Sequence, residues 1–132
     1  MTLRDTIEPK SDQLNYDDLL AGPLTVRVVG LEAGSAEQPV AVKIVNDEGG
    51  AVMRPWKPCK SMRRVLIACW GDKGKDWIGK RATLYGDATV RFGGVEVGGI
   101  RVSHLSGIDA PRTLKLTTTR SKRAAYTVEP IS

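Results

Sequence analysis

The sequence has few cysteines, histidines and aromatic residues. Two cysteines, Cys59 and Cys69, and one histidine, His104, occur among 132 residues. Two cysteines cannot form a framework of several disulfides, and their spacing of ten residues does not resemble a zinc knuckle. Cys69 is expected to be a packed thiol, and no nucleophile or orienting carboxylate accompanies His104. We therefore expect no metal, no cofactor and no catalytic residue.

Long apolar runs are also absent. No stretch of about 18 apolar residues occurs, so no membrane-spanning helix is expected. The first residues, MTLRDTIEPK, lack the basic and then apolar pattern of a secretion signal. Free thiols suit a reducing compartment. These features favour a cytoplasmic protein.

One segment imitates a phosphate-binding loop but lacks an essential residue. GKDWIGKR (74–81) has the spacing G-x-x-x-x-G-K, yet Arg81 replaces the Ser or Thr that would hold magnesium. The segment is predicted to follow a helix and precede a strand, which reverses the usual order. This pattern argues against nucleotide hydrolysis.

Charge is distributed unevenly along the chain. Residues 1–53 carry 4 Lys/Arg and 9 Asp/Glu, whereas residues 54–132 carry 16 Lys/Arg and 6 Asp/Glu. Clustered cations attract phosphates and release their counterions on binding. The second part of the chain is therefore expected to bind a polyanion.

Hydrophobic periodicity predicts mostly strands. A short helix capped by Asn15 is expected first, and Met62, Val65, Leu66 and Cys69 mark one face of a helix over 61–70. Alternating apolar residues predict strands over 24–31, 39–45, 51–56, 81–86, 88–92, 95–105, 113–120 and 124–131. Gly93-Gly94 is expected to link two of these strands, and Gly98-Gly99 to bend the second.

This order of elements is typical of one small fold class. Three strands, a helix and further strands predict a mainly β, five-stranded OB-fold barrel with its α-helix between strands 3 and 4. The short N-terminal helix and an extra C-terminal β-hairpin would be additions. We expect residues 1–23 to be an extension packed on an OB-fold domain of residues 24–132. No repeats or linkers indicate a second domain.

Cations and aromatic rings alternate in the second part of the chain. Single-stranded nucleic acid is held by this combination, since cations contact phosphates and exposed rings stack on bases. Trp56 and Phe92 are expected on the binding face, whereas Trp70, Trp77 and Tyr85 fit the core as well, and Tyr126 fits either place. The candidate nucleic-acid-binding residues are Arg54, Trp56, Lys57, Lys60, Arg63, Arg64, Lys80, Arg81, Arg91, Phe92, Arg101, Arg120, Lys122, Arg123 and Tyr126.

Five blocks of the sequence resemble a family of small phage- and prophage-encoded proteins. They are KSDQLNYDDLLAGP (10–23), RPWKPCKSMRRVLIACWG (54–71), WIGKRATLYGD (77–87), VRFGGVEVGGIRVSHLSGID (90–109) and LTTTRSKRAAYTV (116–128). Members of this family are described as OB-fold single-stranded-DNA-binding proteins encoded beside phage recombination genes. The resemblance implies a non-enzymatic protein in the cytoplasm of a bacterial host, where it supports DNA recombination or replication together with a phage RecA-like recombinase.

Two other functions remain open at this point. The same barrel would also serve as a protein-interaction or virion adaptor, and its cations would then be a soluble surface. A nuclease would need clustered carboxylates around a metal, for which Asp87, Glu96 and Asp109 are the candidates of the basic part. A homo-oligomer is plausible from exposed sheet edges. The acidic segment around Asp12, Asp17 and Asp18 is a candidate surface for recruiting partners.

Overall fold

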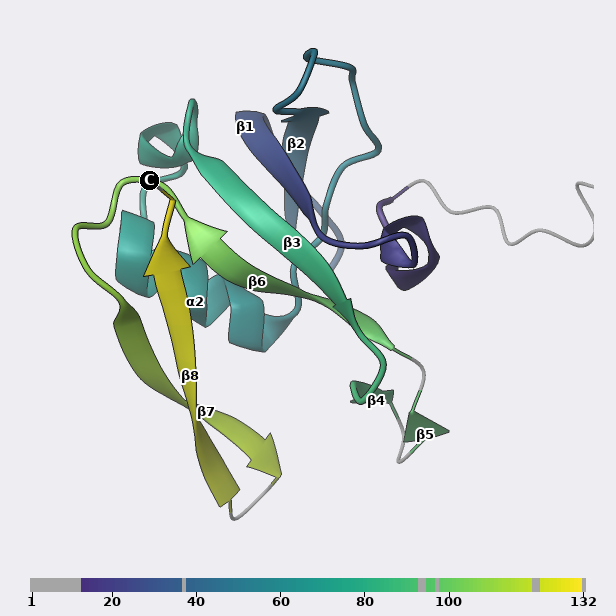
Figure 1. The fold of residues 1–132 in the computed structure, drawn as a ribbon, viewed down its shortest axis with the longest axis vertical. Coiled ribbons are helices and arrows are strands. Elements are labelled where there is room, and N and C mark those ends of the chain that lie inside the picture. The colour runs from purple at the N-terminus through teal and green to yellow at the C-terminus, as the bar shows by residue number, and fades with distance from the viewer. Residues whose placement is uncertain (1–12, 37, 93–94, 97, 120–121, 132) are drawn as a thin grey trace, which may run out of the picture.

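A six-stranded sheet and one α-helix form most of the molecule (Figure 1). The computed structural model describes residues 13–36, 38–92, 95–96, 98–119 and 122–131. The strand order is β2-β1-β3-β6-β8-β7, and only the β6–β8 pair is parallel. The six strands are β1 (Leu24–Ala33), β2 (Val40–Asn46), β3 (Arg81–Asp87), β6 (Gly99–Leu105), β7 (Arg112–Thr119) and β8 (Lys122–Pro130).

The predicted mainly β architecture is confirmed, but within the described residues the sheet is not closed into a barrel. It has six strands rather than five. The expected third strand, 51–56, is reduced to two isolated bridges that join Val52 to Val45 and Trp56 to Val42. Pro55 has no N–H to donate to a ladder, which accounts for the interruption. The edge of β6 pairs with β8 instead of closing on this segment.

Helix α2 (Lys60–Trp70) follows this segment closely as predicted. Met62, Val65 and Leu66 are buried, and Trp70 joins them, whereas Cys69 is only partly buried. The N-cap is Cys59 rather than the expected Ser61, and its side chain makes no capping hydrogen bond. Gly71 ends it at φ 88°, a left-handed conformation that favours glycine.

The short N-terminal helix is a 3-10 turn, η1 (Tyr16–Leu19). Asn15 and Asp18 form a capping box, which confirms the expected cap. The Tyr16 ring packs so closely on Gly98 that a Cβ there would lie 2.7 Å from it. Gly98 has φ +80°, so the expected bend is present and only glycine fits it.

The hairpins differ in detail from the prediction. The strand expected over 88–92 is only β4 (Arg91–Phe92), which pairs with β5 (Val95–Glu96). Before it, Thr89 donates two hydrogen bonds to Asp87 and forms a turn. The Gly93-Gly94 link lies outside the described residues. The expected C-terminal hairpin is confirmed as β7 and β8.

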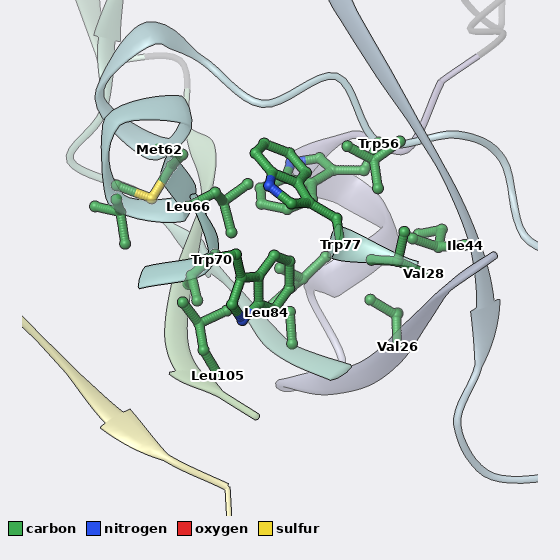
Figure 2. Packing of buried hydrophobic residues seen from close by; sticks show 14 of the residues in the cluster. Val26, Val28, Ile44, Trp56, Met62, Leu66, Trp70, Trp77, Leu84 and Leu105 are labelled. Carbon is green, nitrogen blue, oxygen red and sulfur yellow. The ribbon is translucent and has the colours of Figure 1, made fainter. Parts of the chain in front are cut away.

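The core lies between the sheet and α2 (Figure 2). Val26 and Val28 of β1, Leu84 of β3 and Leu105 of β6 face the helix side. The three tryptophans are buried, and η2 (Gly74–Trp77) places Trp77 edge-on to Trp70 with ring centroids 5.8 Å apart. No helix of the described residues is long and apolar enough to cross a membrane.

Candidate nucleic-acid interface

The side of the sheet that faces away from the core carries polar and charged residues. In β3, Ala82 and Leu84 are buried, so Arg81, Thr83 and Tyr85 point to the opposite side. Helix α2 lies behind the sheet in Figure 1 and does not cover this side. We call this surface the sheet face. It consists of Thr25, Arg27, Arg81, Thr83, Tyr85, Arg101 and His104, which β1, β3 and β6 bring together in register.

One end of the sheet face holds two arginines around one carboxylate. Arg27 and Arg81 are directly paired across β1 and β3. Asp47 lies 2.8 Å from Arg27 Nη2 and 3.4 Å from Arg81 Nη1. The arginine side chains stay exposed, at 50% and 36%, whereas Asp47 is 17% exposed. The carboxylate therefore orients both guanidinium groups and leaves one net positive charge facing solvent.

The middle of the sheet face carries hydroxyl and imidazole groups. The Thr25 and Thr83 hydroxyls are hydrogen-bonded across the strands at 2.8 Å. Ser103 Oγ lies 2.7 Å from His104 Nδ1, beside Thr83. This strip offers hydroxyl and imidazole groups that can hydrogen-bond to sugars or phosphates.

The other end is a network of Tyr85, Tyr126, Arg101 and Asp87. The Tyr126 hydroxyl donates to the Val102 carbonyl and lies 3.4 Å from the Tyr85 hydroxyl. Burial, reinforced by the Tyr85 hydrogen bond, raises the pKa of Tyr126 well above its ordinary value. The phenol is therefore neutral at physiological pH.

Arg101 links this network to Asp87. Its Cζ lies 5.7 Å from the centroid of the Tyr126 ring, and its buried Nε lies 2.8 Å from Asp87 Oδ2 in an ion pair. Burial acts to raise the pKa of Asp87, but the hydrogen bonds from Thr89 and the charge of Arg101 outweigh it and hold that pKa below its ordinary value. Asp87 is thus an anion that fixes Arg101 in place.

The structure corrects the expectation for Trp56. The side chain is 2% exposed and belongs to the core, so it offers no face to a base. Its backbone exchanges hydrogen bonds with buried Val42 at 2.8 and 2.9 Å, which turns the ring inward. Tyr126 is half-buried, with Arg101 over its ring. Tyr85, which we did not include among the candidates, is the half-buried ring of the sheet face.

The predicted cations do not gather on one surface. Arg81 and Arg101 lie on the sheet face, and Lys80 lies at the start of β3 beside Gly107. A second group lies in α2, on the other side of the sheet, and in the segment just before it: Arg54, Lys57, Lys60, Arg63 and Arg64. Arg91, Phe92, Lys122 and Arg123 are placed by their backbone in β4 and β8, and their side chains, like all of Arg120, lie outside the described residues.

Sequence reasoning missed Arg27 and Asp47. The alternation of Thr25, Val26, Arg27 and Val28 would have placed Arg27 on the polar side of β1. No local signal points to Asp47, because its role depends on contacts with two strands distant in sequence.

The described residues contain no group of three or more His, Cys, Asp or Glu that could hold a metal ion. Cys59 and Cys69 are free thiols, and burial, only partly offset by Arg112, raises the pKa of Cys69. Comparison with protein-family models, with curated proteins and with solved structures found no match.

Proposed function

We propose that the protein binds single-stranded DNA, with little sequence preference, along the sheet face. The observation that carries the proposal is the placement of three arginines on three neighbouring strands, with Tyr85 and hydroxyl groups between them. Arg27, Arg81 and Arg101 outnumber Asp47 and Asp87 on this surface. Phosphates would contact the guanidinium groups, and one or more bases would stack on Tyr85.

We further propose that the sheet is an OB-fold that is opened and extended. The chain runs through β1, β2, the bridged segment 51–56, α2, β3 and β6, which is the order of strands and helix in that fold. On this interpretation, the β7–β8 hairpin occupies the edge of β6 where the barrel would otherwise close. OB-folds commonly bind oligonucleotides on their sheet surface, which supports the proposed ligand.

The wider role rests on the resemblance to phage proteins. We propose that the chain is non-enzymatic and supports phage DNA recombination or replication in the bacterial cytoplasm, in contact with a RecA-like recombinase. The free edge of β7 in the described sheet supports the proposal of a homo-oligomer.

A salt series of titrations tests the proposed function. Fluorescence anisotropy of end-labelled oligo-dT, a matched duplex and a matched RNA would be measured with the wild-type protein and two variants. We expect tight binding to the single strand, with a log–log salt slope of about −0.7 per phosphate contacted. Arg81→Gln should reduce this slope by about 0.7, because one phosphate contact is lost. Tyr85→Ala should weaken binding without changing the slope.

Lys75→Gln is the matched control, because Lys75 is exposed in η2 and does not belong to the sheet face. Its salt slope and affinity should equal those of the wild type. Absence of binding to the single strand even at low salt would refute the proposal and favour an adaptor that binds protein.

A further inference from the structure

A second basic surface surrounds the start of α2. We call it the basic segment: Arg54, Lys57, Lys60, Arg63 and Arg64. Between Glu48 and Asp72 the chain has no acidic residue. Within the described residues, Arg54, Lys60 and Arg64 are exposed and take part in no ion pair. Arg54, Lys60 and Arg64 are therefore a concentrated positive charge that no acidic side chain of the described residues neutralises.

The basic segment and the sheet face point in opposite directions. Helix α2 buries Met62, Val65 and Leu66 against the core side of the sheet. Arg64, next to buried Val65, is exposed on the outer side of the helix. The sheet and the core lie between the sheet face and the exposed side chains of Lys60 and Arg64.

The cations stand where they oppose the stability of the helix. The first turn of α2 contains no acidic residue, its N-cap side chain makes no capping bond, and its last turn contains no basic residue. The helix dipole favours the reverse arrangement. Lys60 and Arg64 are also four residues apart, a spacing at which like charges repel. A bound anion would relieve this repulsion and match the helix dipole.

The ligand expected here is a phosphate backbone without base contacts. Trp56, the ring nearest in sequence, is buried, and Ile67 is the exposed large apolar residue of α2. Arg63 donates from Nη1 to the Pro58 carbonyl at 2.8 Å, and this hydrogen bond fixes its guanidinium group within the basic segment. Exposed cations without a stacking ring suit a sequence-independent contact with phosphates.

We propose that the basic segment binds a second stretch of single-stranded DNA, so that one chain holds two strands on opposite sides. This inference rests on the proposed function of the sheet face. It adds a further activity, because a protein that holds two single strands at once raises their local concentration and would accelerate the pairing of complementary strands.

The number of short oligonucleotides bound per chain tests this inference. Labelled dT5 is short enough to lie on one surface, since it is near the lower end of the roughly 4–16 nucleotides that one OB-fold covers. Sedimentation with absorbance at two wavelengths would give the ratio of oligonucleotide to protein, which does not depend on oligomeric state. We expect two oligonucleotides per wild-type chain and one per chain of the Lys60→Glu/Arg64→Glu variant, with the affinity of the remaining site changed less than about twofold.

A single reversal at the first turn has a second expected property. Lys60→Glu should raise the Tm of the free protein by about 2–5 °C, because an acid in the first turn matches the helix dipole and no longer repels Arg64 four residues on. Lys75→Glu, a charge reversal outside both surfaces, should keep two oligonucleotides per chain. Lys60→Gln/Arg64→Gln provides a milder change if the double reversal does not fold.

The outcomes separate the two proposals. One oligonucleotide per wild-type chain that the double variant still binds, or two per chain of the folded double variant, would overturn the inference and leave the sheet face as a binding site. One oligonucleotide that the double variant no longer binds would overturn the proposed function of the sheet face. No bound oligonucleotide at all would overturn the proposed function itself.

Discussion

At the scale of single residues, Trp56 shows how charged neighbours mislead. Arg54 and Lys57 flank it in sequence, and we took these cations as a sign that the ring is exposed. The ring is 2% exposed, because the two backbone hydrogen bonds to Val42 fix the segment along β2 and turn the ring toward α2. Long cationic side chains can reach solvent from the edge of a core, so their presence does not indicate whether the residue between them is exposed.

Trp56→Ala should therefore lower the free energy of unfolding and leave the DNA-binding surface unchanged. Removal of a buried tryptophan costs about 3–5 kcal/mol of unfolding free energy. Urea denaturation followed by circular dichroism would measure this loss. Tyr85→Ala, a change on the sheet face, should cost much less. A Trp56→Ala variant as stable as the wild type would contradict the placement of the ring in the core.

Asp87 gives a prediction on pH dependence. Its pKa is held below the ordinary value in the folded state, so the carboxylate stabilises the fold above the unfolded value of about 3.9 and this contribution is lost as pH falls below it. Asp87→Asn should be less stable than the wild type near pH 7, and the difference should shrink below about pH 4. Thermal melts from pH 3 to pH 7 would measure it. A constant difference over this range would show that the charge of Asp87 does not contribute.

At the scale of elements, the spacing of apolar residues predicted the helix correctly, because a helix is formed by contacts between residues close in sequence. The apolar stripe of Met62, Val65 and Leu66 and the stop at Gly71 located α2 within one residue. The predictions of a strand over 51–56 and of a closed barrel were wrong for another reason. Closure depends on whether β6 pairs with an early segment or with β8, and these alternatives are contacts between distant parts of the chain. Likewise, alternation locates the polar side of each strand, but the pairing of Arg27 with Arg81 requires the sheet order.

Tyr126 fastens the C-terminal hairpin to the sheet. The β6–β8 ladder is limited to His104–Glu129 and Leu105–Pro130, and Tyr126 extends the attachment by donating to the Val102 carbonyl. Tyr126→Phe would leave this carbonyl without that donor, at a cost of about 1–3 kcal/mol. Hydrogen exchange should accelerate in β8 and remain unchanged in α2. Equal acceleration in both elements would show that the hairpin does not open by itself.

The same hydroxyl predicts the alkaline behaviour of the fold. Because the pKa of Tyr126 is raised in the folded state, its contribution to stability is complete below the unfolded value of about 10 and declines as pH rises above it. The stability difference between the wild type and Tyr126→Phe should therefore narrow above about pH 10. Denaturation in urea at pH 8 and pH 11 measures the change. An unchanged difference would place the phenol in water rather than in the network.

At the scale of the whole molecule, cations that lie together in the second part of the sequence are divided between two sides of the fold. The cations of the second part do not form one surface, since the strand alternation sends Arg81 and Arg101 to one side and the start of α2 carries its cations on the other. The core between the two surfaces contains all three tryptophans. Neither proposed contact with DNA therefore has an exposed indole ring.

This arrangement predicts how the intrinsic fluorescence responds to DNA. Saturating oligo-dT should leave the tryptophan emission maximum unchanged, because Trp56, Trp70 and Trp77 are at most 6% exposed and no base can stack on them. Anisotropy of a labelled oligonucleotide would rise in the same titration. Urea is the positive control, since unfolding exposes the indoles and shifts their emission to longer wavelength. Strong quenching with a shifted maximum on DNA binding, without loss of structure by circular dichroism, would mean that a tryptophan reaches the bases and that the strand follows a path other than the sheet face.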